Sequence, residues 1–450
     1  MHRRLTSVSA PRVRILAALP ALALLAAACT STTAAPGPTS VAPSAVPVAS
    51  ATSTTAPSDT PAPTPSPTTA PSPTPSLQDL TISPATLSQL RLLWTIEEPG
   101  NPNAQSDCQD MACWRFSRIG SFAFSPDDQT LAVGVCTVDP TENTTNPRHY
   151  RYNCDGPSEA RLYDSATGEL MQTLAVGDYP LSLAFHPDGT YLAAGMAQRS
   201  IEVWDLAAAK KVQTLLHSTT RTGVYRLAFS PDGALLVSSG DSMLQLWDWA
   251  RGLPQGIIEN VSSFSIDPAG GKLATLFWSE RGDYAEARFY PLDDPGRFRA
   301  FPVDWRLYPH AVAYTPDGSR LVVFGDYEIA LLDPGSGDVS GETDLADLLA
   351  SGQEGTVDST EKFTPDGHLI LQASQWEGDD LLSGLALWTP SDAGALAAWL
   401  PEFPEGNGTL LVGPAGRFLI TAHSRVLLGL WGVDPTAPAK EATCLGTCSP

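Results

Sequence analysis

The residue types that perform most enzyme chemistry are present in this chain, but their spacing matches no catalytic motif. No G-x-S-x-G nucleophile turn, P-loop or dinucleotide-binding fingerprint occurs. Carboxylates are abundant, but with 49 Asp and Glu in 450 residues, neighbouring pairs are expected without any function. The histidines beyond the N-terminal stretch show no H-E-x-x-H or other paired metal-binding spacing; they are His149, His186, His217, His310, His368 and His423. We therefore predict that the protein is not an enzyme and holds no cofactor and no metal.

The N-terminus has the pattern of an export signal. Four arginines precede an apolar run over 15–28 that is too short to span a bilayer comfortably and ends in small residues. We predict a signal peptide at 1–28. The sequence LLAAA directly before Cys29 resembles the lipobox of bacterial lipoproteins, which implies that Cys29 is lipidated and becomes the new N-terminus. The alternative is an ordinary cleaved signal that leaves Cys29 unmodified.

A linker is predicted between this anchor and the rest of the chain. Residues 30–76 consist mainly of Ser, Thr, Pro and Ala, with Asp59 as the only charge. Such a segment cannot bury enough apolar surface to offset its ordering entropy, and its proline favours an extended polyproline II conformation. We therefore assign 29–77 to the lipidated cysteine and a disordered linker, and 78–450 to a folded domain.

Net charge restricts the partners of this domain. From Cys29 onward the chain has 23 basic and 49 acidic residues, a formal charge of −26. An acidic surface repels phosphate backbones and anionic lipids. We therefore expect no nucleic-acid partner, and contact with the membrane only through the lipid anchor, in the extracytoplasmic part of the cell envelope (cell surface or periplasm).

Six further cysteines suggest disulfides, because an even number in an exported chain is typical of them. Cys136 ends one apolar run and Cys154 just precedes the next, so a bridge between them would close the base of a long loop. The remaining four lie near the two ends of the folded region and could pair locally or with one another: Cys108, Cys113, Cys444 and Cys448.

Short apolar strands and tight turns recur through the domain. Seven turns of the type Pro-Asp-Gly begin at Pro126, Pro187, Pro231, Pro268, Pro316, Pro365 and Pro414, separated by 61, 44, 37, 48, 49 and 49 residues. An apolar strand precedes each turn and a second follows it; a third strand ends in Trp204-Asp205 or Trp247-Asp248 in the two most regular repeats. A fourth, weaker strand fills the gap before the next repeat. Four antiparallel strands at this period predict the blades of an all-β, seven-bladed β-propeller.

The repeat resembles the WD40 family, in which the first strand (a) ends in such a turn and the third (c) ends in Trp-Asp. The resemblance covers most of residues 117–436 and implies that Trp204 and Trp247 are structural. It also implies a hydrogen-bonding network around the second of these tryptophans, involving His217, Ser239 and Asp241. An eight-bladed quinoprotein-type propeller is the alternative fold, suggested only by the turn at 164–168.

The family resemblance further implies that the terminal blade combines strands from both chain ends. Residues 92–96 or 114–116 could supply the N-terminal strand, whereas residues 440–445 could complete the blade without them.

Insertions indicate where function lies. Blade three connects its second (b) and third (c) strands through a minimal turn at residues 240–242, whereas longer b–c connections are predicted at 137–153, 278–286 and 375–382. In this fold all three emerge on one face. They carry aromatic, Arg and acidic residues of the kind found at recognition surfaces. The candidate binding residues are His149, Tyr150, Arg151, Tyr152, Trp278, Arg281, Tyr284, Trp376, Glu377 and Asp379.

The sequence thus predicts a lipid-anchored propeller that binds a protein or glycan partner through its b–c face. Two alternatives stay open at this point. One is a lactonase- or hydrolase-like propeller with a metal in its central channel. The other is similarity to the propeller lipoproteins that assist assembly of outer-membrane proteins.

Overall fold

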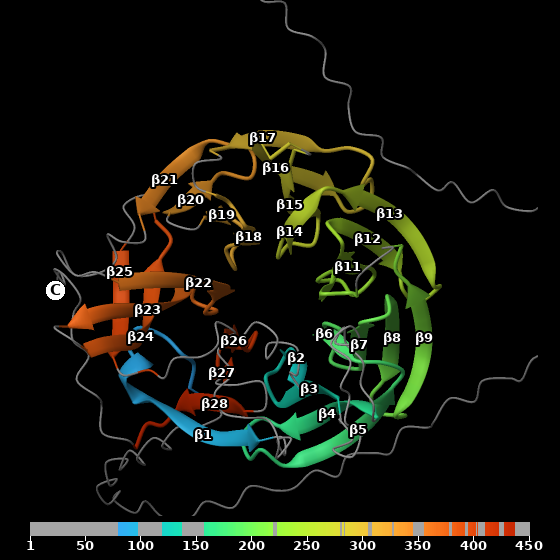
Figure 1. The fold of residues 1–450 in the computed structure, drawn as a ribbon, viewed down its shortest axis with the longest axis horizontal. Coiled ribbons are helices and arrows are strands. Elements are labelled where there is room, and N and C mark those ends of the chain that lie inside the picture. The colour runs from blue at the N-terminus through green and yellow to red at the C-terminus, as the bar shows by residue number, and fades with distance from the viewer. Residues whose placement is uncertain are drawn as a thin grey trace, which may run out of the picture. The chain divides into compact units, whose positions relative to one another are not determined.

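Twenty-eight strands form seven four-stranded antiparallel sheets in the part of the chain that the structure describes. The structure is a computed structural model. It describes residues 80–97, 119–136, 157–218, 223–279, 281–282, 284–304, 308–325, 328–344, 355–377, 380–391, 395–401, 403, 410–422 and 427–436. The sheets follow one another around a ring (Figure 1), so the predicted seven-bladed β-propeller is confirmed and the eight-bladed alternative is wrong.

Six blades are consecutive four-stranded meanders, with strands a to d in chain order. Blades one to three are β2 (Ile119–Phe124), β3 (Thr130–Cys136), β4 (Ser158–Asp164), β5 (Leu170–Val176); β6 (Pro180–Phe185), β7 (Tyr191–Met196), β8 (Ser200–Asp205), β9 (Lys210–Leu216); and β10 (Arg226–Phe229), β11 (Leu236–Gly240), β12 (Met243–Asp248), β13 (Leu253–Glu259). Blades four to six are β14 (Val261–Ile266), β15 (Lys272–Trp278), β16 (Ala285–Pro291), β17 (Arg299–Val303); β18 (Ala311–Tyr314), β19 (Leu321–Phe324), β20 (Glu328–Leu332), β21 (Val339–Asp344); and β22 (Gly355–Phe363), β23 (Leu369–Glu377), β24 (Asp380–Thr389), β25 (Ala395–Pro401).

Blade seven closes the ring with strands from both chain ends. Its strands a to c are β26 (Leu410–Val412), β27 (Phe418–Ala422) and β28 (Leu427–Val433), and its outer strand is β1 (Leu90–Glu97), which follows the 3₁₀ turn η1 (Leu87–Gln89). β1 pairs antiparallel with β28, from Leu90 opposite Val433 to Glu97 opposite Leu427. The N-terminal candidate at 92–96 is therefore confirmed, while 114–116 and 440–445 lie outside the described residues.

Burial explains why the b strands read as continuous apolar runs. β3 has six consecutive buried residues and β7 has five, because neighbouring blades cover both faces of each sheet near the axis. The outer strand β9 is mostly exposed. Seven apolar clusters form the core, one at each junction between adjacent blades. Figure 1 shows β14 and β18 near the centre of the ring and β13 and β17 at its rim.

Candidate functional site

A meander of four antiparallel strands places its connections alternately on two faces. We call the face with the a–b and c–d connections the turn face, and the face with the b–c and d–a connections the loop face. The seven Pro-Asp-Gly-type turns all belong to the turn face, and the predicted b–c insertions belong to the loop face.

Each a–b turn has the same backbone geometry. The residue two positions after the proline has a positive φ, between 58° at Asp128 and 93° at Gly367, and its amide donates to the carbonyl of the residue before the proline. The carboxylate of the turn accepts hydrogen bonds from nearby hydroxyls and amides, as Asp232 does from Ser230 Oγ at 2.6 Å and from the Ala234 amide at 3.0 Å. These aspartates therefore cap the turns.

These hydrogen bonds lower the pKa of the turn carboxyls. The Thr190 hydroxyl and amide hold the pKa of Asp188 at about 2, against an ordinary value of 3.8. The Ser230 hydroxyl similarly lowers the pKa of Asp232. In blade five the Thr315 hydroxyl lowers that of Asp317. The turn face is thus built from ionised, hydrogen-bonded carboxylates that have a structural role.

One carboxylate joins two blades where the ring closes. Asp128 is completely buried in the turn of blade one and has a φ of 58°, at a position where the other turns have glycine. Its two carboxylate oxygens accept the amides of Ala415 and Arg417 at 3.1 and 3.0 Å, and these amides belong to the turn of blade seven, which has no aspartate of its own. Burial raises the pKa of Asp128, against the effect of these amides.

The hydrogen-bonding network of blade three is present, with one correction. Trp247 Nε1 donates to Ser238 Oγ at 2.9 Å, and His217 Nε2 lies 3.4 Å from the Ser238 carbonyl oxygen. The predicted Ser239 was the wrong serine, because strand residues alternate between faces and only Ser238 lies beside the indole. Burial lowers the pKa of His217, while Asp241 acts in the opposite direction.

The strand-c tryptophans of blades two and six differ in what their indole Nε1 contacts. Trp204 Nε1 donates to the buried Glu202 carboxylate at 3.2 Å, which also binds the Lys211 ammonium at 2.7 Å. In blade six, Trp388 is fully buried and its Nε1 has no partner among the described residues. All of these indoles pack in the core, as expected of scaffold residues.

The loop face contains the candidate binding residues that the structure describes. In blade four, Arg281 and Tyr284 are exposed on a hairpin whose Gly282 has a φ of 67°. Trp278, at the end of β15, instead donates its Nε1 to the Pro309 carbonyl at 3.0 Å and so ties blade four to the start of blade five. His149, Tyr150, Arg151, Tyr152 and Asp379 lie outside the described residues, as do all the cysteines except Cys136.

The predicted loop of blade six is largely strand. Gln375 pairs with Leu382, and Glu377 with Asp380, so β23 and β24 continue almost to the tip of the hairpin. The expectation of a loop over 375–382 is therefore wrong. Unbroken cross-strand pairing absorbs the extra residues, and Trp376 and Glu377 are part of β23.

The turn face has a pocket that we did not predict from the sequence. It has a volume of about 550 Å³ and lies at the rim between blades four and five, where Lys272, Phe289, Tyr290, Pro291, Gly296, Arg297, Phe298, Arg299 and Pro334 line it. The c–d connection 292–298 forms one wall and is longer than the connection 206–209 in blade two. The longer connection, with Arg297 and Arg299 on either side of Phe298, is the sequence signal that could have indicated this pocket.

Within the described ranges, no group of three or more His, Cys, Asp or Glu residues could hold a metal ion. No helix in that same part of the chain is long and apolar enough to span a membrane.

Comparison with known proteins agrees with the geometry of blades one to three. A model of the WD domain, G-beta repeat, matches residues 168–205 and 209–248. The chain contains WD40 repeats. The two matches run from the c–d turn of blade one to the end of β8, and from the start of β9 to the end of β12.

Several curated proteins and solved structures are similar to this chain. Pre-mRNA-processing factor 19 homolog 2 of Arabidopsis thaliana is 27% identical over 36% of this chain and 30% of its own length. Periodic tryptophan protein 2 homolog of Schizosaccharomyces pombe is 30% identical over 24% of this chain and 12% of its own. The chain thus spans less than a third of either relative. Serine-threonine kinase receptor-associated protein of Mus musculus is 22% identical over 59% of this chain and 71% of its own length. A chain in the crystal structure of a mitotic checkpoint complex is 16% identical, with a TM-score of 0.49 over 76% of this chain and 91% of that one.

Proposed function

We propose that this protein is a lipid-anchored, extracytoplasmic WD40-type propeller that binds a protein partner through its loop face. WD40 repeats, which this chain contains, are typical of protein-interaction scaffolds. A glycan partner would use the same face and is an alternative outcome of the experiment below.

The observation that carries the proposal is the unequal length of the b–c connections on one scaffold. In blade three, β11 and β12 are joined by Asp241 and Ser242 alone, both with positive φ as in a type I′ hairpin turn. In blade one, β3 and β4 pair at Cys136 and Ser158, with residues 137–157 between them. A blade needs only two residues there, so the others are free to serve recognition.

The base of this long connection supports the proposed Cys136–Cys154 disulfide. Cys136 is 6% exposed at the end of β3 and faces Ser158 across the hairpin, and Cys154 lies four residues before that serine. A bridge there would reduce the conformational freedom of the loop and so the entropy lost on binding.

The hairpin of blade four supports recognition on the same face. Tyr284 is 42% exposed and packs on Phe277 with the ring centroids 6.2 Å apart. An exposed aromatic ring held by a core residue offers contact area at a low entropic cost, and the exposed Arg281 lies beside it.

The anchor and linker complete the proposal. Lipidation at Cys29 and an extended segment through residue 77 would hold the propeller away from the membrane, at about 3.1 Å per extended residue. A Cys29→Ser variant is expected to move from the detergent phase to the aqueous phase in detergent partitioning, while wild type stays in the detergent phase. Equal partitioning of both would contradict the anchor.

A loop exchange tests the binding face. Partners crosslinked in intact cells are identified first, and the variant then replaces residues 138–152 by a short Gly-Ser turn while keeping Cys136 and Cys154. We expect affinity for the captured partner to fall at least tenfold, with the thermal midpoint changing by no more than about 2 °C because the blade itself is intact.

An Arg251→Ala variant is the matched control, because this arginine is exposed on the turn face and pairs only with Asp248 at 3.1 Å. Its affinity should equal that of wild type. Unchanged binding by the loop variant, or an equal loss in the control, would contradict the proposal.

A further inference from the structure

The pocket at the rim of blades four and five has an unusual charge for this protein. Three of its nine lining residues are cations, in a chain whose formal net charge is −22, and no carboxylate lines it. Within the described residues, the Lys272 ammonium makes no ion pair or hydrogen bond, and Arg299 contacts only the ring of Phe301 at 5.4 Å. Arg297 differs from these two because it lies 3.5 Å from the carboxylate of Asp294.

Apolar and aromatic residues make up most of the rest of the lining. Phe289 and Tyr290 are 4% and 2% exposed and belong to the cores on either side of blade four. Phe298 is half-buried, and its ring lies 5.2 Å from that of Tyr290. The exposed Lys272 and Arg299 therefore lie at the edge of an apolar surface.

The wall formed by residues 292–298 is held in place from two sides. The guanidinium of Arg288 is nearly buried between the rings of Phe277 and Phe298, at 3.2 and 4.9 Å, and pairs with Glu286 at 2.7 Å. Pro295 packs against the backbone of Gly256 in the outer strand of blade three, where an added Cβ would lie 2.8 Å from the proline ring.

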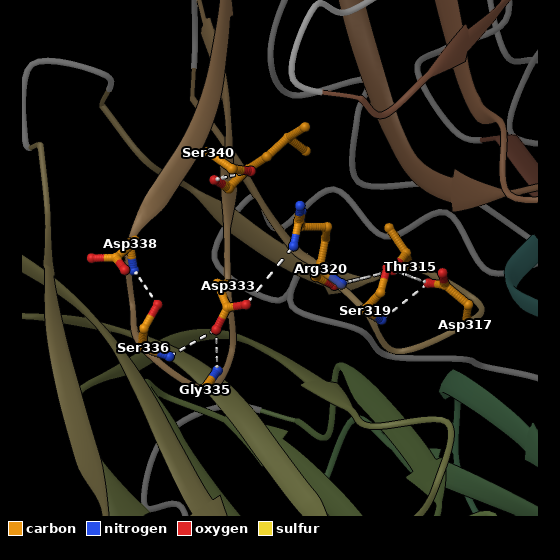
Figure 2. A network of polar contacts seen from close by, with 10 residues as sticks. Thr315, Asp317, Ser319, Arg320, Asp333, Gly335, Ser336, Asp338 and Ser340 are labelled. Carbon is orange, nitrogen blue, oxygen red and sulfur yellow. Dashed lines mark hydrogen bonds and ion pairs between the residues drawn. The ribbon is translucent and has the colours of Figure 1, made fainter.

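The opposite wall is equally constrained. Pro334 belongs to the c–d turn of blade five, in which the Asp333 carboxylate accepts the amides of Gly335 and Ser336 at 2.8 and 2.7 Å. Arg320 Nη1 lies 3.8 Å from the same carboxylate and links this turn to the a–b turn, as Figure 2 shows. Because both walls are fixed, the pocket is preformed and needs little ordering to accept a ligand.

From these observations we propose that this pocket is a second binding site, distinct from the loop face, for an apolar carboxylate. Its apolar body would lie against Phe289, Pro291 and Pro334, and its carboxylate would bind Lys272 and Arg299. The volume of about 550 Å³ is that of an ordinary small-ligand site. The same chemistry is available from a free aromatic acid or from an acidic residue beside an apolar one in a peptide. The proposal is independent of the loop-face partner.

Calorimetric titration of the full chain tests the site with matched probes. The probes are 3-phenylpropionate, its neutral amide, and a blocked peptide acetyl-Asp-Phe-Leu-amide. We expect at least one of the two acids to bind, and the neutral amide to bind at least tenfold more weakly. Binding of 3-phenylpropionate identifies a small-molecule site, and binding of the peptide alone identifies a peptide site.

The double variant K272Q/R299Q should weaken binding of the acid at least tenfold, and its unchanged circular dichroism would show that it folds. R251Q is the control, because it removes a cation from the corresponding c–d turn of blade three. Its affinity should stay within twofold of wild type. The proposal is overturned if neither acid binds, if the amide binds as well as the acid, or if R251Q weakens binding as much as the double variant.

Discussion

The two faces of the propeller are built from connections of opposite character. On the turn face, seven a–b turns repeat one backbone geometry, and their carboxylates are occupied by hydrogen bonds of the turn itself or of a neighbouring turn. On the loop face, the b–c connections range from the two residues at Asp241–Ser242 to the long connection 137–157. The ring requires the residues of the a–b turns, but of the b–c connections it requires only the ends. Sequence variation that does not affect folding is therefore possible mainly on the loop face.

The strongest test of the turn face is Asp128→Gly. Glycine keeps the positive φ, but the amides of Ala415 and Arg417 lose their acceptor where the ring closes. We expect the free energy of unfolding at pH 7 to fall by about 2 kcal/mol, measured by urea denaturation. Asp127→Gly is the control, since the hydrogen bonds of this carboxylate stay within its own turn and their loss should cost less. An equal effect of both variants would show that the link between blades has no special role.

A pair of tryptophan variants tests whether single polar bonds in the scaffold matter. Trp247→Phe removes the hydrogen bond to Ser238, whereas Trp388→Phe removes an Nε1 that has no partner in the described part of the chain. Both indoles are buried, so the loss of ring size is similar. The first variant should therefore be less stable than the second by about 1 kcal/mol in urea denaturation. Equal losses would mean that the network of blade three adds nothing to stability.

Acid should lower the free energy of unfolding because it protonates the carboxyls of the turn face. The pKa of Asp188, Asp232 and Asp317 is lower in the folded chain than the ordinary 3.8, so their contribution is complete above about pH 4 and is lost as the pH falls toward 2. The triple Asp→Asn variant should be less stable at pH 7, and its free energy of unfolding should depend less on pH between 4 and 2. An unchanged pH dependence in denaturation experiments would contradict the assigned role of these carboxyls.

The architecture was predictable because it depends on local patterns. Alternating apolar strands and turns at a regular period specify blades. The closing strand was implied only by the family resemblance, which left 92–96, 114–116 and 440–445 as candidates, and the pairing of β1 with β28 decides for the first. The family resemblance predicted a network around Trp247 but selected Ser239 instead of Ser238, because one residue of register changes the face of a strand.

Features that depend on packing between blades were not predictable. Asp128 looks like a variant of the turn glycine, and only the closed ring brings it to Ala415. The rim pocket combines Lys272 of blade four with Pro334 of blade five, which are distant in sequence.

The extra residues of blade six could form either a loop or a longer hairpin, and cross-strand pairing such as Glu377 with Asp380 decides for the hairpin.

The most direct test of the central claim is hydrogen exchange of the full chain with and without its captured partner. Amides of the loop-face segment 279–284 and of the strand ends beside the connection 137–157 should exchange more slowly in the complex. Amides of the a–b turns, such as those of Gly189, Gly233 and Gly318, should exchange at the same rate in both states. Slower exchange at the a–b turns with no change on the loop face would contradict the account.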